Sequence, residues 1–239
     1  MTAGDGMGRR SRVVRGDWAG ESPAPPSDDR ITSMRYLAAL LLVSLPLPSH
    51  AAKLLNGNLD NWEAIGDGLW SVLRDGTLVG QRDLAKAEHQ AWLYTRKNDY
   101  GEFDLHLEWW TRSGGNSGVS IRDTSRGQYA VAAAWDAAKT PAHIGYEIQI
   151  LNSSRDKYSS GSVYLFDAAK PGHQIENDWN AFDIESRDDM IRVKLNGQLV
   201  SQYAGEPGRS KTGPIGLQLH DKNSIVMFRN IHIKELKRK

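Results

Sequence analysis

Short runs of alternating apolar and polar residues, separated by turn signals, are the feature that most constrains the fold of this chain. In the segment 103–109 every second residue is apolar. Because successive side chains of a strand point to opposite faces of a sheet, this period of two predicts a half-buried β-strand. The dipeptides Asp75-Gly76 and Asn196-Gly197 are typical of tight hairpin turns between such strands. The pattern therefore predicts a protein built from hairpin-connected strands.

The same pattern recurs along most of the chain. We expect strands at residues 67–72, 77–79, 91–95, 103–109, 119–122, 145–151, 162–166, 180–186, 190–195, 198–203, 215–220 and 225–233. Helical periodicity is limited to one short stretch at 135–138. Many short strands without long helices predict an all-β fold, either an antiparallel sandwich or a barrel. Long loops at 125–144 and 152–161 are expected to border a binding site.

The N-terminal part has the pattern of a secretory signal peptide at 34–51. A basic start at Met34-Arg35 precedes the apolar run 37–47, and small residues occupy the −3 and −1 positions of a cleavage site at Ser49 and Ala51. The run is shorter than the roughly 20 residues that span a bilayer. We expect a periplasmic or secreted protein with no membrane span after cleavage. An uncleaved anchor or a buried helix is the alternative.

The remaining residues, 52–239, are enough for one domain with its own core. Residues 1–33 are interpreted as a disordered leader or as a start assigned too far upstream. The whole chain has 30 Lys and Arg against 29 Asp and Glu, and this balance argues against nucleic acid as a partner. The lack of cysteine excludes disulfides, thiolate catalysis and cysteine-ligated zinc. The oligomeric state is left open.

Three predicted strands place chemically active pairs opposite their apolar residues. The pairs are Ser120 with Arg122, Glu147 with Gln149, and Gln218 with His220. Because each pair has a spacing of two, its members share one face of the sheet. These residue types can hold and transform a polyhydroxylated ligand if the three strands are neighbours.

Eight short motifs in order along the chain carry a resemblance to a known family. They are Leu54 to Trp62 (LLNGNLDNW), Asn116 to Arg122 (NSGVSIR), Gly145 to Leu151 (GYEIQIL), Gly161 to Tyr164 (GSVY), Trp179-Asn180, Leu195 to Gly197 (LNG), Gly213 to His220 (GPIGLQLH) and Phe228 to Ile231 (FRNI). Over nearly all of 54–236 the chain resembles the 3-keto-disaccharide hydrolase family, also described as a 3-keto-α-glucoside 1,2-lyase/3-keto-2-hydroxy-glucal hydratase domain. The resemblance implies a concanavalin A-like jelly roll of two antiparallel sheets and a saccharide substrate.

The chemistry that this resemblance implies needs a base, a group that stabilises an enolate and groups that hold a sugar. A ketone at C3 acidifies the C2 proton, and loss of that proton expels the C1 substituent by β-elimination. We expect His220 to be the base, because histidine can exchange a proton near neutral pH. Glu147 is the alternative base or orients His220, and Arg122 would stabilise the enolate oxygen. The competing interpretation is a structural His220 and a buried ion pair between Glu147 and Arg122.

Further residues are candidates for substrate binding. Gln149, Gln218 and Asn116 can donate and accept hydrogen bonds to sugar hydroxyls, although structural hydrogen bonding is equally compatible with their types. Tyr164 is a weaker candidate acid. Trp135, in the loop 125–144, could stack on a sugar ring.

Three alternatives complete the prediction. An ordinary glycosidase needs two carboxylates, whereas the strand 147–152 holds only Glu147, so this mechanism is disfavoured. A divalent metal could be held by Glu147 and His220 together with Glu108 or His106. A non-catalytic, lectin-like module that binds saccharides on the same face is the competing function.

Overall fold

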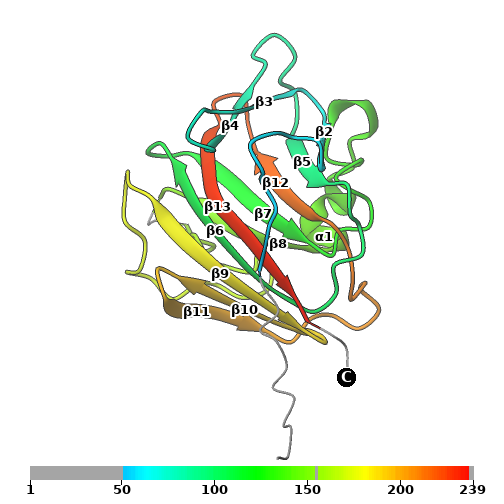
Figure 1. The fold of residues 1–239 in the computed structure, drawn as a ribbon. Coiled ribbons are helices and arrows are strands. Elements are labelled where there is room, and N and C mark those ends of the chain that lie inside the picture. Colours follow the sequence, from blue (N-terminus) through cyan, green and yellow to red (C-terminus); the bar gives the residue numbers. More distant parts are fainter. Residues whose placement is uncertain (1–50, 154–155, 237–239) are drawn as a thin grey trace, which may run out of the picture. The chain divides into compact units, whose positions relative to one another are not determined.

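The computed structural model describes residues 51–153 and 156–236, which form two antiparallel sheets (Figure 1). The leader and all but the last residue of the expected signal segment lie outside the described residues. The eight-stranded large sheet contains β1 (Ala52–Lys53), β3 (Gly68–Val72), β4 (Leu78–Arg82), β6 (Phe103–Thr111), β9 (Asn180–Arg187), β10 (Met190–Leu195), β11 (Gln198–Tyr203) and β13 (Ile225–Glu235). The five-stranded small sheet contains β2 (Trp62–Ile65), β5 (Ala91–Thr95), β7 (Asn116–Ile121), β8 (Tyr146–Leu151) and β12 (Ile215–Leu219).

The strand order makes this a sandwich with many crossovers. The large sheet runs β11-β10-β9-β6-β13-β4-β3, with β1 paired to β13, and the small sheet runs β2-β5-β12-β7-β8. No helix of the described part has the length and apolar character needed to cross a membrane. The predicted all-β fold of two antiparallel sheets is therefore confirmed.

The hydrophobic core lies between the sheets and follows the predicted alternation. Along β6 every second side chain is buried and the residues between are partly exposed. In the small sheet Val119, Ile148 and Leu217 are fully buried in the core. Their sequence neighbours point to the outer face, because side chains alternate along a strand. The small sheet thus supplies both the core and the surface on which the site is built.

Two local predictions were wrong. Residues 162–166 do not form a strand: Val163 makes only isolated bridges to Ile148 and Asp167, and Leu165 has a left-handed φ of 75°. The short helix expected at 135–138 is replaced by 3₁₀ turns at Ala132–Ala134 and Ala137–Lys139, followed by the helix α1 (Pro141–Ile144).

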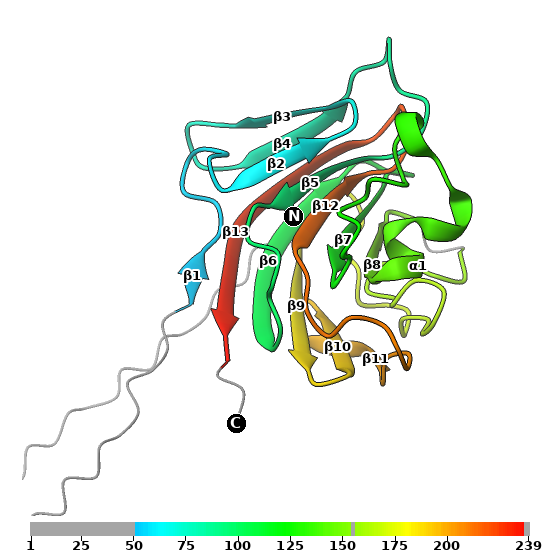
Figure 2. The ribbon, with the colours of Figure 1, turned by 90° about the vertical axis from the view of Figure 1, so that its right-hand side faces the viewer.

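The long loop between β7 and β8 covers part of the outer face of the small sheet. Figure 2 shows α1 and the adjoining turns beside β7 and β8. Beneath the loop, Trp92 and Tyr94 of β5 are fully buried with Ala130 in a cluster separate from the main core. The loop is therefore held on the small sheet by a small apolar cluster that is separate from the main core.

A buried carboxylate, that of Asp123, ties this loop to the sheet. Its Oδ2 accepts hydrogen bonds from Tyr94 Oη (2.6 Å) and Gly127 N (2.8 Å), and its Oδ1 accepts from Ser125 N (2.9 Å). Burial, reinforced by the Asp123 charge, raises the pKa of Tyr94 well above its ordinary value, so the phenol remains a donor. One side chain thereby fixes both the start of the loop and its contact with β5.

The substitution Asp123→Ala should destabilise the domain by about 2–4 kcal/mol, because it leaves buried donors without an acceptor. Urea denaturation followed by tryptophan fluorescence measures the change. Asp60→Ala is the matched control, since Asp60 is exposed and a surface change of this kind alters stability by less than about 0.5 kcal/mol. Equal effects of the two substitutions would refute the anchoring role of Asp123.

Candidate functional site

A pocket of about 190 Å³ lies on the outer face of the small sheet. Its lining includes six residues singled out from the sequence: Asn116, Glu147, Gln149, Tyr164, Gln218 and His220. Four others complete it: Gln90, Ala137, Thr140 and His143. We call this the polar pocket. Strands β8, β7 and β12 are consecutive neighbours in the sheet, so the predicted pairs on β8 and at the end of β12 do meet on one face.

The register of β7 against β8 gives Glu147 its position. Ser120 is opposite Glu147 and Gly118 is opposite Gln149. The Glu147 side chain lies over Gly118, because a Cβ atom added at residue 118 would be 2.5 Å from Glu147 Oε1. Only glycine leaves this space free, which explains the use of glycine in the middle of β7.

The carboxyl group of Glu147 is buried without a compensating cation. Its residue is 4% exposed, and it forms no ion pair within the described residues. Burial raises the pKa of Glu147 to about 8, while the adjacent Gln218 amide lowers it by a smaller amount. Glu147 is consequently mostly protonated at neutral pH and is suited to donate a proton or a hydrogen bond.

Several amide atoms around Glu147 are buried without a partner. Among the described residues, Asn116 Oδ1 and Gln149 Oε1 have no hydrogen-bond partner. Neither polar atom of the Gln218 side chain forms a hydrogen bond of good geometry, although its amide is close enough to Glu147 to lower the pKa of that carboxyl group. Each such atom costs about 1–3 kcal/mol unless something fills its hydrogen-bonding capacity. Their convergence on one pocket marks the place of a polar ligand or of water.

Two histidines line the same pocket as the carboxyl group. His220 follows β12; its side chain is 43% exposed, and its Nδ1 lies 3.5 Å from Asp221 Oδ2. His143, on α1, places Nδ1 2.8 Å from Thr140 Oγ1. Burial, with a smaller effect of Arg209, lowers the pKa of His143 below its ordinary value, so this imidazole is neutral at pH 7.

His143 and Gln90 are pocket residues that sequence reasoning missed. His143 belongs to the loop that was expected to border the site and lies four residues before Glu147, which was the available signal. Gln90 had no comparable signal, because it precedes β5 and reaches the pocket only through the fold. Its Oε1 accepts a hydrogen bond from Trp92 Nε1 (3.1 Å).

Tyr164 reaches the rim of the pocket although its segment is not a strand. Its backbone N donates to Glu147 O (2.9 Å). Burial, followed by the charges of Glu147 and Tyr158, raises the pKa of Tyr164, so its hydroxyl stays protonated. It is a donor rather than a base.

Arg122 does not line the polar pocket, and the role expected for it is corrected. It follows β7 with a left-handed φ of 58°, so the alternation of the strand ends one residue earlier. Its Nη2 donates to Ser186 Oγ (2.7 Å) and to Asp188 O (2.5 Å), at the end of a large-sheet strand. Arg122 therefore links the two sheets and is not among the residues that line the polar pocket, and among the ion pairs of the described residues none joins it to Glu147.

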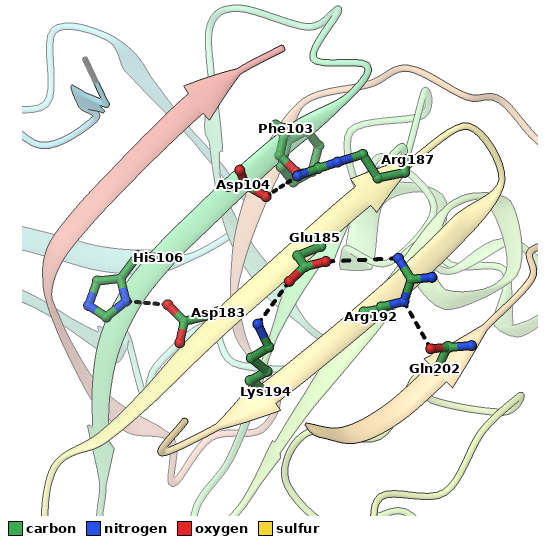
Figure 3. A network of polar contacts seen from close by, with 9 residues as sticks. All are labelled: Phe103, Asp104, His106, Asp183, Glu185, Arg187, Arg192, Lys194 and Gln202. Atoms are coloured by element: carbon green, nitrogen blue, oxygen red, sulfur yellow. Dashed lines mark hydrogen bonds and ion pairs between the residues drawn. The ribbon is translucent and has the colours of Figure 1, made fainter. Parts of the chain in front are cut away.

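The ligand set considered for a divalent metal is not assembled either. His106 and Glu108 lie on β6 of the large sheet. The His106 Nδ1 atom is 2.7 Å from Asp183 Oδ1, and this pair is drawn in Figure 3. Glu108 accepts hydrogen bonds from Arg229 Nε and Asn230 Nδ2, both at 2.6 Å. Within the described part of the chain, no group of three or more His, Cys, Asp or Glu could hold a metal.

Trp135 lies outside the polar pocket but next to it. It lines a second hollow of about 390 Å³, which we call the adjoining groove. The groove is formed by residues 87–90, Trp135 and residues 220–222, and it shares Gln90 and His220 with the polar pocket.

Comparisons with known proteins agree with this architecture. A "putative glycosyl hydrolase" from Parabacteroides distasonis ATCC 8503 is 25% identical, with 78% of this chain and all of that chain covered and a TM-score of 0.62. A carbohydrate-binding module from Bacillus subtilis (15% identity, 74% and 98% covered, TM-score 0.51) and a Bacillus subtilis protein with a galectin-like fold (10%, 80% and 96%, 0.55) share the fold.

The galectin-like neighbour identifies the sandwich as a jelly roll of the expected kind. No curated protein is significantly similar to the chain. A family model, the 3-keto-alpha-glucoside-1,2-lyase-like domain, matches residues 50–234, which is most of the chain. The protein belongs to the 3-keto-alpha-glucoside-1,2-lyase-like family.

Proposed function

We propose that this protein is an exported enzyme that cleaves 3-keto-glycosides by removing the C2 proton and eliminating the C1 substituent. One observation carries the proposal: a buried carboxyl group, two histidines and several amides with unpartnered atoms share one pocket. Family membership and the likeness to the "putative glycosyl hydrolase" from Parabacteroides distasonis support a carbohydrate substrate. Export rests on the predicted signal segment at 34–51.

In the proposed reaction Glu147 replaces the cation first expected at the ketone. Its carboxyl group, protonated at neutral pH because of burial, donates a hydrogen bond to the C3 oxygen. As the C2 proton leaves, negative charge accumulates on that oxygen. A preorganised donor in a water-poor site stabilises such an enolate more strongly than water does.

His220 is the proposed base. It takes the C2 proton and returns it to the C1 oxygen as the C1–O bond breaks and a C1–C2 double bond forms. The products are a 2-hydroxy-glucal enone and a free alcohol, and addition of water at C1 completes a net hydrolysis. General acid–base assistance of this kind typically contributes about 10²–10⁴-fold. His143, neutral at pH 7, is the second candidate for the proton transfer.

The amides of the pocket are proposed to hold the sugar. Gln149, Gln218 and Asn116 present the unpartnered atoms, each suited to a hydroxyl. Hydrogen bonds from a bound sugar would remove the free-energy penalty of these unpartnered buried atoms. The bound sugar would also exclude water from Glu147. Binding and activation thus use the same surface.

Glu147→Gln and His220→Ala should each lower kcat on a 3-keto-glucoside at least tenfold, because the first replaces the acidic donor at the C3 oxygen with a weaker amide donor and the second removes the base. Enone absorbance and released alcohol measure turnover. Glu108→Gln and His106→Ala, the same changes on the large sheet, are the matched controls and should retain activity. His143→Ala identifies the base: a larger loss than with His220→Ala would move that role to His143.

Unchanged rates in both Glu147→Gln and His220→Ala would contradict the proposal. Tight saccharide binding by the wild-type protein with no product from any 3-keto-glycoside would instead favour the lectin-like module. Calorimetric binding measured beside turnover separates these outcomes.

The pH dependence tests the acid role of Glu147. Since the reactive form is protonated, kcat should fall as the pH rises through about 8. The falling limb should vanish in Glu147→Gln, whose amide does not titrate. A wild-type profile that instead rises through this range would show that Glu147 acts as a carboxylate base.

A further inference from the structure

We propose that the adjoining groove is the subsite for the leaving group and that Trp135 makes the enzyme select leaving groups that carry a ring. This inference rests on the proposed function and adds the specificity of the same site. It is based on three observations: His220 lines both hollows, the exposed Trp135 ring is stacked on His89, and the groove is lined by polar and charged residues.

The position of His220 connects the two hollows. His220 and Gln90 line both the polar pocket and the adjoining groove. If the keto-sugar occupies the polar pocket with its C1–O bond at His220, the group beyond that bond enters the adjoining groove. The groove, at about 390 Å³ against about 190 Å³, is the roomier of the two.

Trp135 is held as a platform. Its ring stacks on the imidazole of His89 with 4.3 Å between centroids and 6° between planes. The next residue fixes the backbone, because Asp136 N donates to Tyr129 O (2.9 Å). One ring face is thus covered by His89, yet Trp135 remains 41% exposed. An exposed tryptophan in a loop has no packing role comparable to that of the buried tryptophans.

The groove pairs this platform with polar groups. Glu88, Asp221 and Lys222 belong to its lining. A flat or ring-shaped group gains stacking contact on an aromatic face, and charged neighbours satisfy hydroxyls at its edge. A methyl or other short alkyl leaving group would reach neither. The groove chemistry therefore fits a hydroxylated ring, either a second sugar or a hydroxylated aryl group.

The test compares Trp135→Ala with the wild-type full chain on three substrates: a methyl 3-keto-glucoside, a 3-keto-disaccharide and a hydroxyphenyl 3-keto-glucoside. Loss of stacking should raise KM about tenfold for the two ring-bearing substrates, with kcat nearly unchanged. KM for the methyl glycoside should stay within about twofold. A KM rise for only one ring-bearing substrate identifies which kind of ring the groove takes.

Three further variants sharpen the result. Trp135→Phe keeps a stacking face and should restore most of the affinity. His89→Ala removes the support of the platform and should raise KM in the same direction. Trp179→Ala is the matched control, because Trp179 contacts the Arg229 guanidinium (4.0 Å) of the large sheet, away from the groove. It should leave every KM unchanged.

The outcomes separate the two proposals. If the wild-type protein converts none of the substrates, the proposed function fails and the subsite with it. If it converts them but Trp135→Ala raises KM equally for the methyl and ring-bearing substrates, or for neither, the subsite is refuted while the lyase function stands.

Discussion

The period-two alternation of the small sheet is the constraint on which the rest of the structure depends. Three strands, β7, β8 and β12, must fill the core with one face and build the polar pocket with the other. Val119, Ile148 and Leu217 are fully buried between the sheets, whereas Glu147 and Gln218 line the pocket. A register slip of one residue would exchange the two sets and destroy core and site together.

The site costs stability, and the anchored loop above it offsets part of that cost. Burial raises the pKa of Glu147 from 4.5 to about 8, so the folded state holds a proton that the unfolded state releases. Stability therefore falls as the pH rises through this window and is insensitive to Glu147 below it. The Asp123 anchor offsets the cost locally, because its hydrogen bonds hold the loop start on β5.

Much of the site could be predicted from strand patterns, because the pattern states which side chains share a face. Glu147, Gln149 and Gln218 were correctly grouped for this reason. Arg122 was grouped with them wrongly. Its left-handed φ ends the strand geometry at that residue, although the apolar and polar residue types continue to alternate in the sequence. Trp135 was expected to stack on the sugar, but it lines the adjoining groove rather than the polar pocket. Its position depends on contacts with residues distant in sequence, such as the stacking on His89.

By itself, the sequence determined the all-β class, most of the strands and the pairs of polar side chains that share a face. These follow from local geometry, since alternation and turn residues act over a few positions. Only the tertiary structure decided that β8, β7 and β12 are neighbours and that His143 joins them from a loop. It also decided that the Glu147 carboxyl loses contact with water. Strand order and desolvation depend on residues distant in sequence, and no short pattern encodes them.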